Sequence, residues 1–390
     1  MRIVVLGGGG KMGSIAVQAL SKEDRVDEIV IADYNTEAAQ VVADFIGSPK
    51  IRIQFADVND HDGLVKVLQG ANACVNATVY YTNLQVMEAC LEAGVPYTDL
   101  GGLFHVTLKQ LELSERFAAR GLSAVLGMGS APGVPNIQAR YAADRLDTME
   151  YIHIYDGIKP PPPDDLRFTY AVPTILDEMN MPPVVYRDGE FVEVEPLTGF
   201  EDYMFSDNLG VLPMHYSLHS EVATLPRTFR AKGVRECFFK INYWGMAKET
   251  VEKVRVLGEF GFNDTQPVNV KGTSVVPRDF LVAMMAKFVP PVTAFLEPPK
   301  NRPPDWAKEI VTEVKGTKDG EEVIYRLGTV TLKGALPTGT APALAAIWLA
   351  EGRIAPGVHP PEAAIDPVPF FQDLARHDIY TRVTVTRPVA

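Results

Sequence analysis

Residues 2–13 read RIVVLGGGGKMG, and this stretch decides the fold. A short run rich in valine and isoleucine is typical of a buried β-strand, and it passes directly into glycines. Gly8, Gly10 and Gly13 have the spacing Gly-x-Gly-x-x-Gly. In that spacing the first glycine permits a tight turn, the second lets a pyrophosphate approach the backbone, and the third lets a helix pack close to the strand. The stretch therefore predicts a strand, a phosphate-binding loop and a helix.

Asp33 lies at the end of the second β-rich run, 20 residues after Gly13. An acidic residue at that distance is expected to accept hydrogen bonds from the ribose hydroxyls of a dinucleotide. The alternative is a glycine-rich structural turn with an unrelated aspartate, but the strand before the glycines and the helix after them favour the dinucleotide. Asp33 would repel a 2′-phosphate, and residues 34–36 supply no cation, so we expect NAD as cofactor. Lys11 and Met12 complete the predicted loop.

From residue 1 to about 130, short β-rich runs alternate with helical runs. This α/β alternation predicts a doubly wound parallel sheet of the Rossmann type, with helices on both faces. The expected strands are residues 2–6, 28–32, 51–56, 73–77, 96–100 and 123–127. The expected helices are residues 14–20, 36–45, 62–68, 83–93 and 107–119.

Two further groups follow strands of this predicted sheet. Asp57 and Val58 follow the third strand, where this fold places the adenine, although a turn-forming aspartate is an equal alternative for Asp57. Asn76, Ala77 and Thr78 end the fourth strand, near the point where the strand order reverses and ligands bind. We expect this second group to contact the nicotinamide half of the cofactor.

The regular alternation of strands and helices ends after the sixth predicted strand. Residues 159–165 read KPPPPDD, and strand-like segments follow at 183–195 and 236–244. These features predict a second, mixed α+β domain that begins near residue 135. Residues 341–351 predict an apolar helix, which we expect to return to the first domain.

Composition narrows the possible partners and location. The formal net charge is -12, which disfavours binding to a phosphate backbone, so we expect no nucleic-acid partner. No apolar stretch approaches the roughly 18–20 residues that a membrane helix needs, so no membrane partner is expected. Cys74, Cys90 and Cys237 have spacings that fit neither a disulfide framework nor a metal site. We expect reduced cysteines, no metal and a cytoplasmic protein.

Several blocks of the chain resemble the saccharopine dehydrogenase superfamily, and those after residue 135 are most similar to its lysine 6-dehydrogenases. The blocks are VNATVY at 75–80, MEACLEAGVPYTDLGG at 87–102, GMGSAPG at 127–133, EVATLP at 221–226 and IDP at 365–367. The resemblance implies a discontinuous NAD-binding Rossmann domain of residues 1–134 and about 335–390. It also implies a substrate and oligomerisation domain of residues 135–334, in a homo-oligomer that is a dimer or larger.

The resemblance further implies a small amino-acid substrate and a reaction. The ε-amine of L-lysine would be oxidised with NAD to 2-aminoadipate 6-semialdehyde, which cyclises, and ammonia would be released. One alternative is a dehydrogenase of the saccharopine or carboxynorspermidine type that acts on a secondary amine. Another is a regulator that senses NAD(H) without turnover.

Amine oxidation requires that the ammonium first lose a proton, because only a neutral amine can push electrons as hydride leaves the neighbouring carbon. The resemblance places Asp99 and Glu221 near the cleft as candidate bases, against the alternatives of a turn cap and an ion pair. His105 and His219 are the neutral alternatives and candidate substrate ligands. Tyr80 is expected either to pack on the nicotinamide ring or to fill the core.

The carboxylate of an amino-acid substrate suits a planar arginine fork. Arg227 is the first candidate because it follows the 221–226 block, and Arg167 and Arg278 come next. Thr224 lies within that block and is a further candidate substrate ligand, and the resemblance adds Gly101 to the cofactor site.

Overall fold

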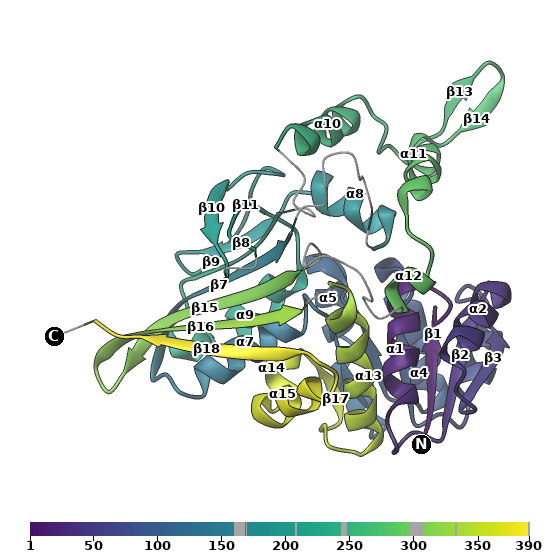
Figure 1. Ribbon diagram of the computed structural model, residues 1–390, viewed down its shortest axis with the longest axis horizontal. Coiled ribbons are helices and arrows are strands. Elements are labelled where there is room, and N and C mark those ends of the chain that lie inside the picture. The colour runs from purple at the N-terminus through teal and green to yellow at the C-terminus, as the bar shows by residue number, and fades with distance from the viewer. Residues whose placement is uncertain are drawn as a thin grey trace.

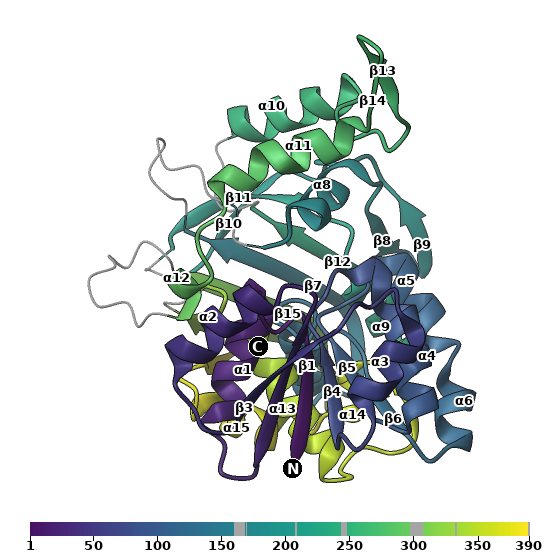
Figure 2. The same ribbon diagram turned by 90° about the vertical axis from the view of Figure 1, so that its right-hand side faces the viewer.

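The first sheet of the molecule is parallel and carries the glycine-rich loop. This computed structural model describes residues 1–159, 168, 170–206, 209–242, 248–296, 307–331 and 334–388. The strand order is β17-β6-β5-β4-β1-β2-β3, and the order reverses between β1 and β4. The predicted doubly wound parallel sheet is thereby confirmed (Figure 2). Its strands are β1 Arg2–Leu6, β2 Glu28–Asp33, β3 Ile51–Phe55, β4 Ala73–Asn76, β5 Tyr97–Asp99, β6 Ser123–Val125 and β17 Gly357–His359.

Helices connect these strands and lie close to the predicted positions. One predicted helix, residues 107–119, is instead two helices, which begin at Leu103 and at Ser114. Gly94 ends α4 in the left-handed conformation expected of a glycine cap, with φ 74°. The helices are α1 Lys11–Ser21, α2 Thr36–Ile46, α3 His61–Leu68, the short η1 Tyr80–Thr82, α4 Asn83–Ala93, α5 Leu103–Leu111 and α6 Ser114–Ala119.

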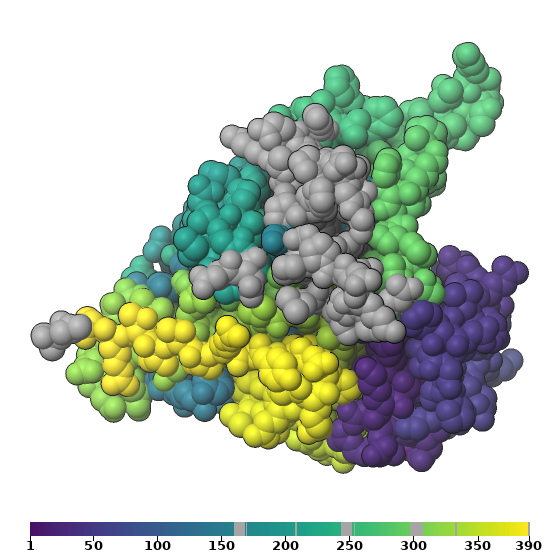
Figure 3. Space-filling model, viewed as in Figure 1, coloured from purple at the N-terminus to yellow at the C-terminus, as the bar shows by residue number. Residues whose placement is uncertain are grey.

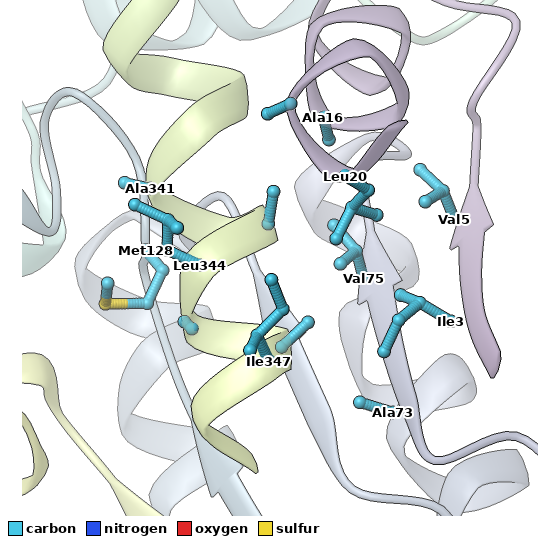
Figure 4. Close-up of a cluster of buried hydrophobic side chains, with 14 of the residues drawn as sticks. Ile3, Val5, Ala16, Leu20, Ala73, Val75, Met128, Ala341, Leu344 and Ile347 are labelled. Atoms are coloured by element: carbon cyan, nitrogen blue, oxygen red, sulfur yellow. The ribbon is translucent and has the colours of Figure 1, made fainter. Parts of the chain in front are cut away.

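The predicted C-terminal helix covers one face of this sheet. It is α13, Leu336–Ala350, and its buried side chains share a core with α1, β1 and β4 (Figure 4). A Cβ added to Gly339 would lie 2.5 Å from Ile15 Cβ, so glycine permits the close contact of α13 with α1. Figure 3 shows the C-terminal segment packed beside the N-terminal one. Helices α14 Pro361–Ala364 and α15 Pro367–Ala375 follow.

The second sheet is mixed, and it takes the order β10-β11-β12-β7-β15-β16-β18, with β8 and β9 attached to β12. The final strand, β18, pairs with β16 of this sheet, so the expected range 335–390 is divided between the two sheets. The reason is that α15 ends beside α7, from where the chain runs along the free edge of β16 (Figure 1). The strands are β7 Thr148–Ile158, β8 Val184–Arg187, β9 Glu190–Glu193, β10 Glu201–Met204, β11 Val211–Tyr216, β12 Glu236–Ile241, β15 Lys308–Lys318, β16 Glu321–Thr331 and β18 Tyr380–Thr386.

Two segments that were predicted as strands differ in the structure. The segment 183–195 is a hairpin, because Asp188 and Gly189 both have positive φ and make the tight turn between β8 and β9. The segment 236–244 ends as β12 at Ile241, and residues 243–244 lie outside the described residues, as does most of the proline run.

The remaining helices pack on the second sheet or project from it. An arm made of α10, α11 and the hairpin of β13 and β14 extends away from the body (Figure 1). Among the described residues, no helix has the length and apolar character needed to cross a bilayer. All three cysteines are buried free thiols. The elements are α7 Val134–Ala143, α8 Val172–Asn180, α9 Ser220–Thr228, α10 Lys248–Glu259, β13 Val268–Val270, β14 Thr273–Val275, α11 Pro277–Met285 and α12 Thr293–Leu296.

Candidate active site

A cavity of about 940 Å³ lies where the carboxyl ends of the parallel strands face the second sheet. One end, which we call the loop end, is lined by the loops that follow β1, β2, β3 and β4. The other, which we call the sheet end, is lined by residues of β7, α8, β12 and β15 and by those where α9 begins. Doubly wound folds bind their ligands in this crevice.

The glycine-rich loop supplies the floor of the loop end. Gly10, Lys11 and Met12, three of the predicted cofactor ligands, line the cavity together with Gly7 and Gly9, which the spacing did not single out. Gly10 begins α1 without a side-chain cap. Because the first N–H groups of a helix have no internal partner, this end of α1 is suited to a phosphate.

Gly8 and Gly13 shape the loop without lining the cavity. A Cβ on Gly13 would lie 2.2 Å from the carbonyl oxygen of Gly7, and one on Gly8 would lie 3.0 Å from the carbonyl oxygen of Val5. Gly7 has φ +70°, a left-handed conformation that favours glycine. Gly8 and Gly13 therefore act through packing: the absence of a side chain at each allows the tight loop that lines the cavity.

Asp33 lies in the loop end at the end of β2, as the spacing predicts. Its carboxylate accepts a hydrogen bond of 2.9 Å from the Gly9 N–H and another of 2.9 Å from the Asn35 N–H. These bonds fix the carboxylate beside the glycine loop. Asp57 and Val58 line the same end of the cavity.

The end of β4 forms the middle of the cavity. Ala77, Thr78 and Gly101 line it. Asn76 does not line it: its side-chain oxygen accepts a hydrogen bond of 3.2 Å from the Thr78 N–H, and its side-chain nitrogen donates to Asn83 at 3.0 Å. Asn76 therefore orients the lining residues from behind.

Asp99, one of the two candidate bases, is enclosed by hydrogen-bond donors and does not face the cavity. It does not line the cavity, and its carboxylate accepts hydrogen bonds from Tyr97 at 2.9 Å and from Gln110 at 2.6 Å. The N–H groups of Gly101 and Gly127 donate to its other oxygen. Burial raises the pKa of Asp99 and these bonds oppose the rise. With both carboxylate oxygens occupied, Asp99 links the end of β5 to the chain at Gly101 and Gly127 and is not placed to accept a proton from a substrate.

The sheet end gathers titratable side chains that the sequence did not single out. Lys308 Nζ lies 2.9 Å from Asp156 Oδ2, and both residues line the cavity. Glu178 lines it too and accepts a hydrogen bond from the Tyr170 hydroxyl. Burial raises the pKa of Glu178 to about 7, a value suited to proton exchange near neutral pH.

His219 also lines the sheet end, and Glu221 lies behind it. Glu221 is fully buried outside the cavity lining, and its Oε2 lies 2.5 Å from His219 Nδ1. The imidazole stacks on Phe239 with ring centres 3.8 Å apart. Burial would lower the pKa of His219, but the Glu221 carboxylate outweighs it and the pKa is raised. Glu221 is thus placed to orient His219 and not to contact a ligand in the cavity.

Tyr80 lines the cavity, but its hydroxyl is engaged. It donates a hydrogen bond of 2.9 Å to Asp177 on α8, and Asp177 forms an ion pair of 2.6 Å with Arg278 on α11. Burial raises the pKa of Tyr80. Tyr80 therefore joins the first domain to the second at the cavity, and Arg278 is not available to a substrate carboxylate.

Three other predicted substrate ligands lie away from the cavity. His105 is exposed on α5, and Thr224 is buried on α9 beside Asn136. Arg227 is exposed because it is on the outer side of α9, where its guanidinium lies 4.1 Å from the centre of the Phe191 ring. Arg167 lies outside the described residues.

Models of two domains from one protein family match almost the whole chain. The saccharopine dehydrogenase NADP binding domain matches residues 3–125, and the saccharopine dehydrogenase C-terminal domain matches residues 129–379. The chain belongs to the saccharopine dehydrogenase family. The predicted superfamily is confirmed, and this family member is an oxidoreductase with a nicotinamide-dinucleotide-binding domain.

Curated relatives of this saccharopine dehydrogenase family member have names from polyamine chemistry. A carboxyaminopropylagmatine dehydrogenase from Synechocystis is 26% identical over 83% of this chain and 80% of the relative. A carboxynorspermidine synthase from Vibrio cholerae is 24% identical over 73% of this chain and 72% of the relative. Activity on L-lysine stays a prediction.

Solved structures with the same fold include two enzymes. Saccharopine dehydrogenase (L-Glu forming) from Saccharomyces cerevisiae has a TM-score of 0.70 at 16% identity, over 99% of each chain. Homospermidine synthase from Legionella pneumophila, in complex with NAD, has a TM-score of 0.66 at 14% identity, over 99% of this chain and 91% of the other. These likenesses concern the fold.

Sequence reasoning missed Asp156, Glu178 and Lys308 because they come from three separated elements of the second domain. One signal was present for Asp156: it continues the alternation of Ile152 and Ile154 along β7 and puts an acid where an apolar residue is expected. The other two carry no local signal, since Glu178 lies in an ordinary helical turn and Lys308 is the first residue of a strand, where lysine is common.

Proposed function

We propose that this family member uses NAD to oxidise, or NADH to form, a carbon–nitrogen bond in a cationic amino-acid substrate of the carboxylated-polyamine class. The observation that carries the proposal is one cavity with a phosphate cradle at its loop end and Asp156, Glu178 and His219 at its sheet end. Among the described residues that line the sheet end, two are acidic, Asp156 and Glu178, and one is a lysine, Lys308. This balance favours a cationic ligand. The names of the curated relatives support the same class.

The residues of the loop end fit a nicotinamide dinucleotide. The uncapped start of α1 would hold the pyrophosphate, and Asp33 would accept hydrogen bonds from the adenosine ribose. Asp57 and Val58 would border the adenine, and Thr78 and Gly101 the nicotinamide half. The bound cofactor supplies a hydride acceptor, or in reverse a hydride donor, at its nicotinamide ring.

NAD is favoured over NADP by the charges near Asp33. A 2′-phosphate would meet the Asp33 carboxylate, and Tyr34 and Asn35 beside it carry no positive charge. Lys11 is the cation that lines the described part of the loop end, and its Nζ lies 3.4 Å from the carbonyl oxygen of Phe168. Burial lowers the pKa of Lys11 to about 8, which weakens it as a permanent phosphate ligand.

Glu178 and His219 are the groups that would exchange a proton with the substrate nitrogen. In the oxidative direction the substrate ammonium must lose a proton before its C–H bond can release hydride, and the resulting iminium is opened by water to a carbonyl compound and an amine. A carboxyl with a pKa of about 7 can accept that proton, and in reverse it can protonate the imine. Glu221 keeps the His219 ring in one orientation through Nδ1, which leaves Nε2 for the substrate.

L-Lysine is the second candidate, because it combines an amino-acid head with a distal ammonium that could reach the same acidic side chains. Its oxidation would yield 2-aminoadipate 6-semialdehyde and ammonia. A primary and a secondary amine differ in the product that is released, so one assay separates them.

The test is NADH formation by the purified protein with carboxynorspermidine, saccharopine or L-lysine, each with NAD and with NADP. We expect turnover of carboxynorspermidine with NAD. Release of ammonia from lysine, without turnover of either secondary amine, would replace the proposal with lysine dehydrogenation. A lack of NADH with every amine would favour the NAD(H)-sensing alternative.

A homo-oligomeric state and a cytoplasmic location also stay predictions. Exposed aromatic side chains on the arm and directly after its helices, at Phe280, Phe260 and Phe288, support self-association. Light scattering coupled to size-exclusion chromatography would measure the mass, and a monomer at all concentrations would contradict the first of these predictions.

A further inference from the structure

The inner face of the second sheet carries a buried charged pair at the point where it enters the cavity. Ile152, Ile154 and Asp156 follow one another on the same face of β7, and the first two belong to the core. Lys308 begins β15, the strand that pairs antiparallel with β7. The alternation that buries isoleucine thus presents Asp156 to the cavity.

The pair leaves part of its bonding capacity unused. Asp156 is 3% exposed, and its Oδ2 accepts the 2.9 Å contact from Lys308 Nζ. Its Oδ1 is buried and has no hydrogen-bond partner among the described residues. An ammonium group can donate three hydrogen bonds, so Lys308 has capacity beyond the one to Asp156. A buried unpaired carboxylate oxygen is costly unless a ligand donates to it.

The arginines expected to bind a substrate carboxylate are placed elsewhere. Arg227 lies outside the cavity lining and Arg278 is paired with Asp177. Within the described lining, Lys11 lies in the glycine loop and Lys308 is the lysine of the sheet end, where His219 is already paired with Glu221. A carboxylate that enters the sheet end therefore meets Lys308.

We propose that Asp156 and Lys308 form the subsite for the α-amino-acid head of the substrate. The α-ammonium donates to Asp156 Oδ1, and the α-carboxylate accepts from Lys308 Nζ. A zwitterionic head brings one charge of each sign, so it matches a pair of opposite charges better than a plain ammonium or a plain carboxylate does.

The subsite explains how an acidic cavity selects an amino acid. Without Lys308, a polyamine that lacks the carboxylate would bind as well as its carboxylated relative. With the head held by Asp156 and Lys308, the distal nitrogen can turn toward Glu178 and His219, whose charges act on the same region. Selection for the carboxylate is therefore separate from proton transfer.

The proposal rests on the proposed function, and its test compares matched amines. The specificity ratio is kcat/KM for carboxynorspermidine over norspermidine and for L-lysine over cadaverine, where each second member lacks only the carboxylate. We expect Lys308→Met to lower the ratio by about 10- to 100-fold, the loss typical of one hydrogen bond to a charged group, mainly through KM. Lys308→Arg should keep most of the ratio, and NAD affinity should not change.

Lys315→Met is the matched control. Lys315 lies on the same strand, pairs with Glu150 and Glu322, and does not line the cavity, so the ratio should stay at the wild-type value. If Lys308→Met fails to fold, the double variant Asp156→Asn with Lys308→Met removes both charges together and should show the same loss. An unchanged ratio in folded protein would overturn the subsite while the proposed function stands.

A wild-type protein without turnover would refute the proposed function but still allow a test of the subsite. Calorimetry with the NAD-loaded protein would then compare L-lysine with cadaverine. We expect tighter binding of lysine to wild type and equal binding of the two amines to Lys308→Met. Equal binding to wild type, or no binding of lysine, would overturn the subsite.

Discussion

Glu221→Gln is the substitution that tests the pairing behind His219 most directly. It keeps the size of the side chain and removes its charge. Glu221 is fully buried, and its Oε2 lies 2.5 Å from His219 Nδ1, so the pair is shielded from water. We expect the pKa of His219 to fall in the variant, because the Glu221 carboxylate is the largest of the causes that oppose the lowering by burial.

The magnitude follows from the bond that is lost. A hydrogen bond to a charged group contributes about 1.5–3 kcal/mol, and a neutral one about 1 kcal/mol. Glutamine can still accept from the ring, so the expected loss of unfolding free energy is the difference, about 0.5–2 kcal/mol. The folded-state pKa of His219 is raised above its ordinary value of 6.5. The ion pair therefore stabilises the fold fully below that value, and the stabilisation is lost as the pH rises through the raised pKa.

The assay is denaturant unfolding of both proteins at about pH 6, below the ordinary pKa of histidine, and at about pH 9, well above it. The difference between wild type and variant should be larger at the lower pH. An NMR titration of the histidine signals should place the His219 pKa lower in the variant.

Glu236→Gln is the matched control, because Glu236 also contacts a histidine, His153, at 3.1 Å. Burial lowers the pKa of His153 to about 3, so this pair carries no ionic attraction over the tested range. The control should cost under about 0.5 kcal/mol at either pH. Equal losses for Glu221→Gln at both values, or an unmoved His219 pKa, would refute the role given to Glu221.

Four further predictions concern Asp33, the glycine-rich loop, Glu178 and the helix that covers the first sheet. Asp33→Ala should raise kcat/KM for NADP relative to NAD by about tenfold, since it removes one carboxylate from the 2′-phosphate position; a wild type that strongly prefers NADP would contradict the cofactor assignment. Gly13→Ala should lower the free energy of unfolding by about 1–3 kcal/mol through overpacking, because its Cβ would lie 2.2 Å from the carbonyl oxygen of Gly7. Gly10→Ala should fold, because the atom nearest to its Cβ is 3.1 Å away, but it should bind the cofactor more weakly in a titration. Glu178→Gln should lower kcat for amine oxidation by about 10²-fold, and it should abolish the rise in rate as pH passes about 7, where wild-type Glu178 loses its proton; an unaltered pH–rate profile would exclude Glu178 as the base. A fragment of residues 1–134 lacks the cover that α13 provides, so it should neither fold nor bind NAD, and a stable NAD-binding fragment would count against that role.

The first domain was predictable because its signals are local. A strand, a glycine loop and a helix at 2–13 follow from neighbouring residues, and Asp33 follows from its distance to the loop. The apolar character of α13 predicted burial, although its start at Leu336 and the turn back to β18 did not show in the sequence. Strand pairing at an edge depends on which edge is free, and a single strand does not encode that.

The sequence pointed to much of the loop end of the cavity but, among the described titratable residues of the sheet end, to His219 alone. Asp99 and Glu221 stand at the ends of elements where acids often act, yet the hydrogen bonds that occupy Asp99 come from residues up to 28 positions away. Arg227 follows a block shared with the family, but the turn of α9 directs it outward. The type of a residue gives its chemistry, and the direction of its side chain comes from packing.

The sequence by itself determined the parallel sheet, the glycine-rich loop after its first strand, the acidic residue beside that loop and the family. Each of these depends on residues close together in the chain or on blocks of fixed spacing. Only the tertiary structure brought Asp156, Glu178 and Lys308 together, since they come from β7, α8 and β15, and Lys308 lies 152 positions after Asp156. It also decided which carboxylates remain available, because the availability of an oxygen depends on every donor that the fold brings within hydrogen-bond distance of it.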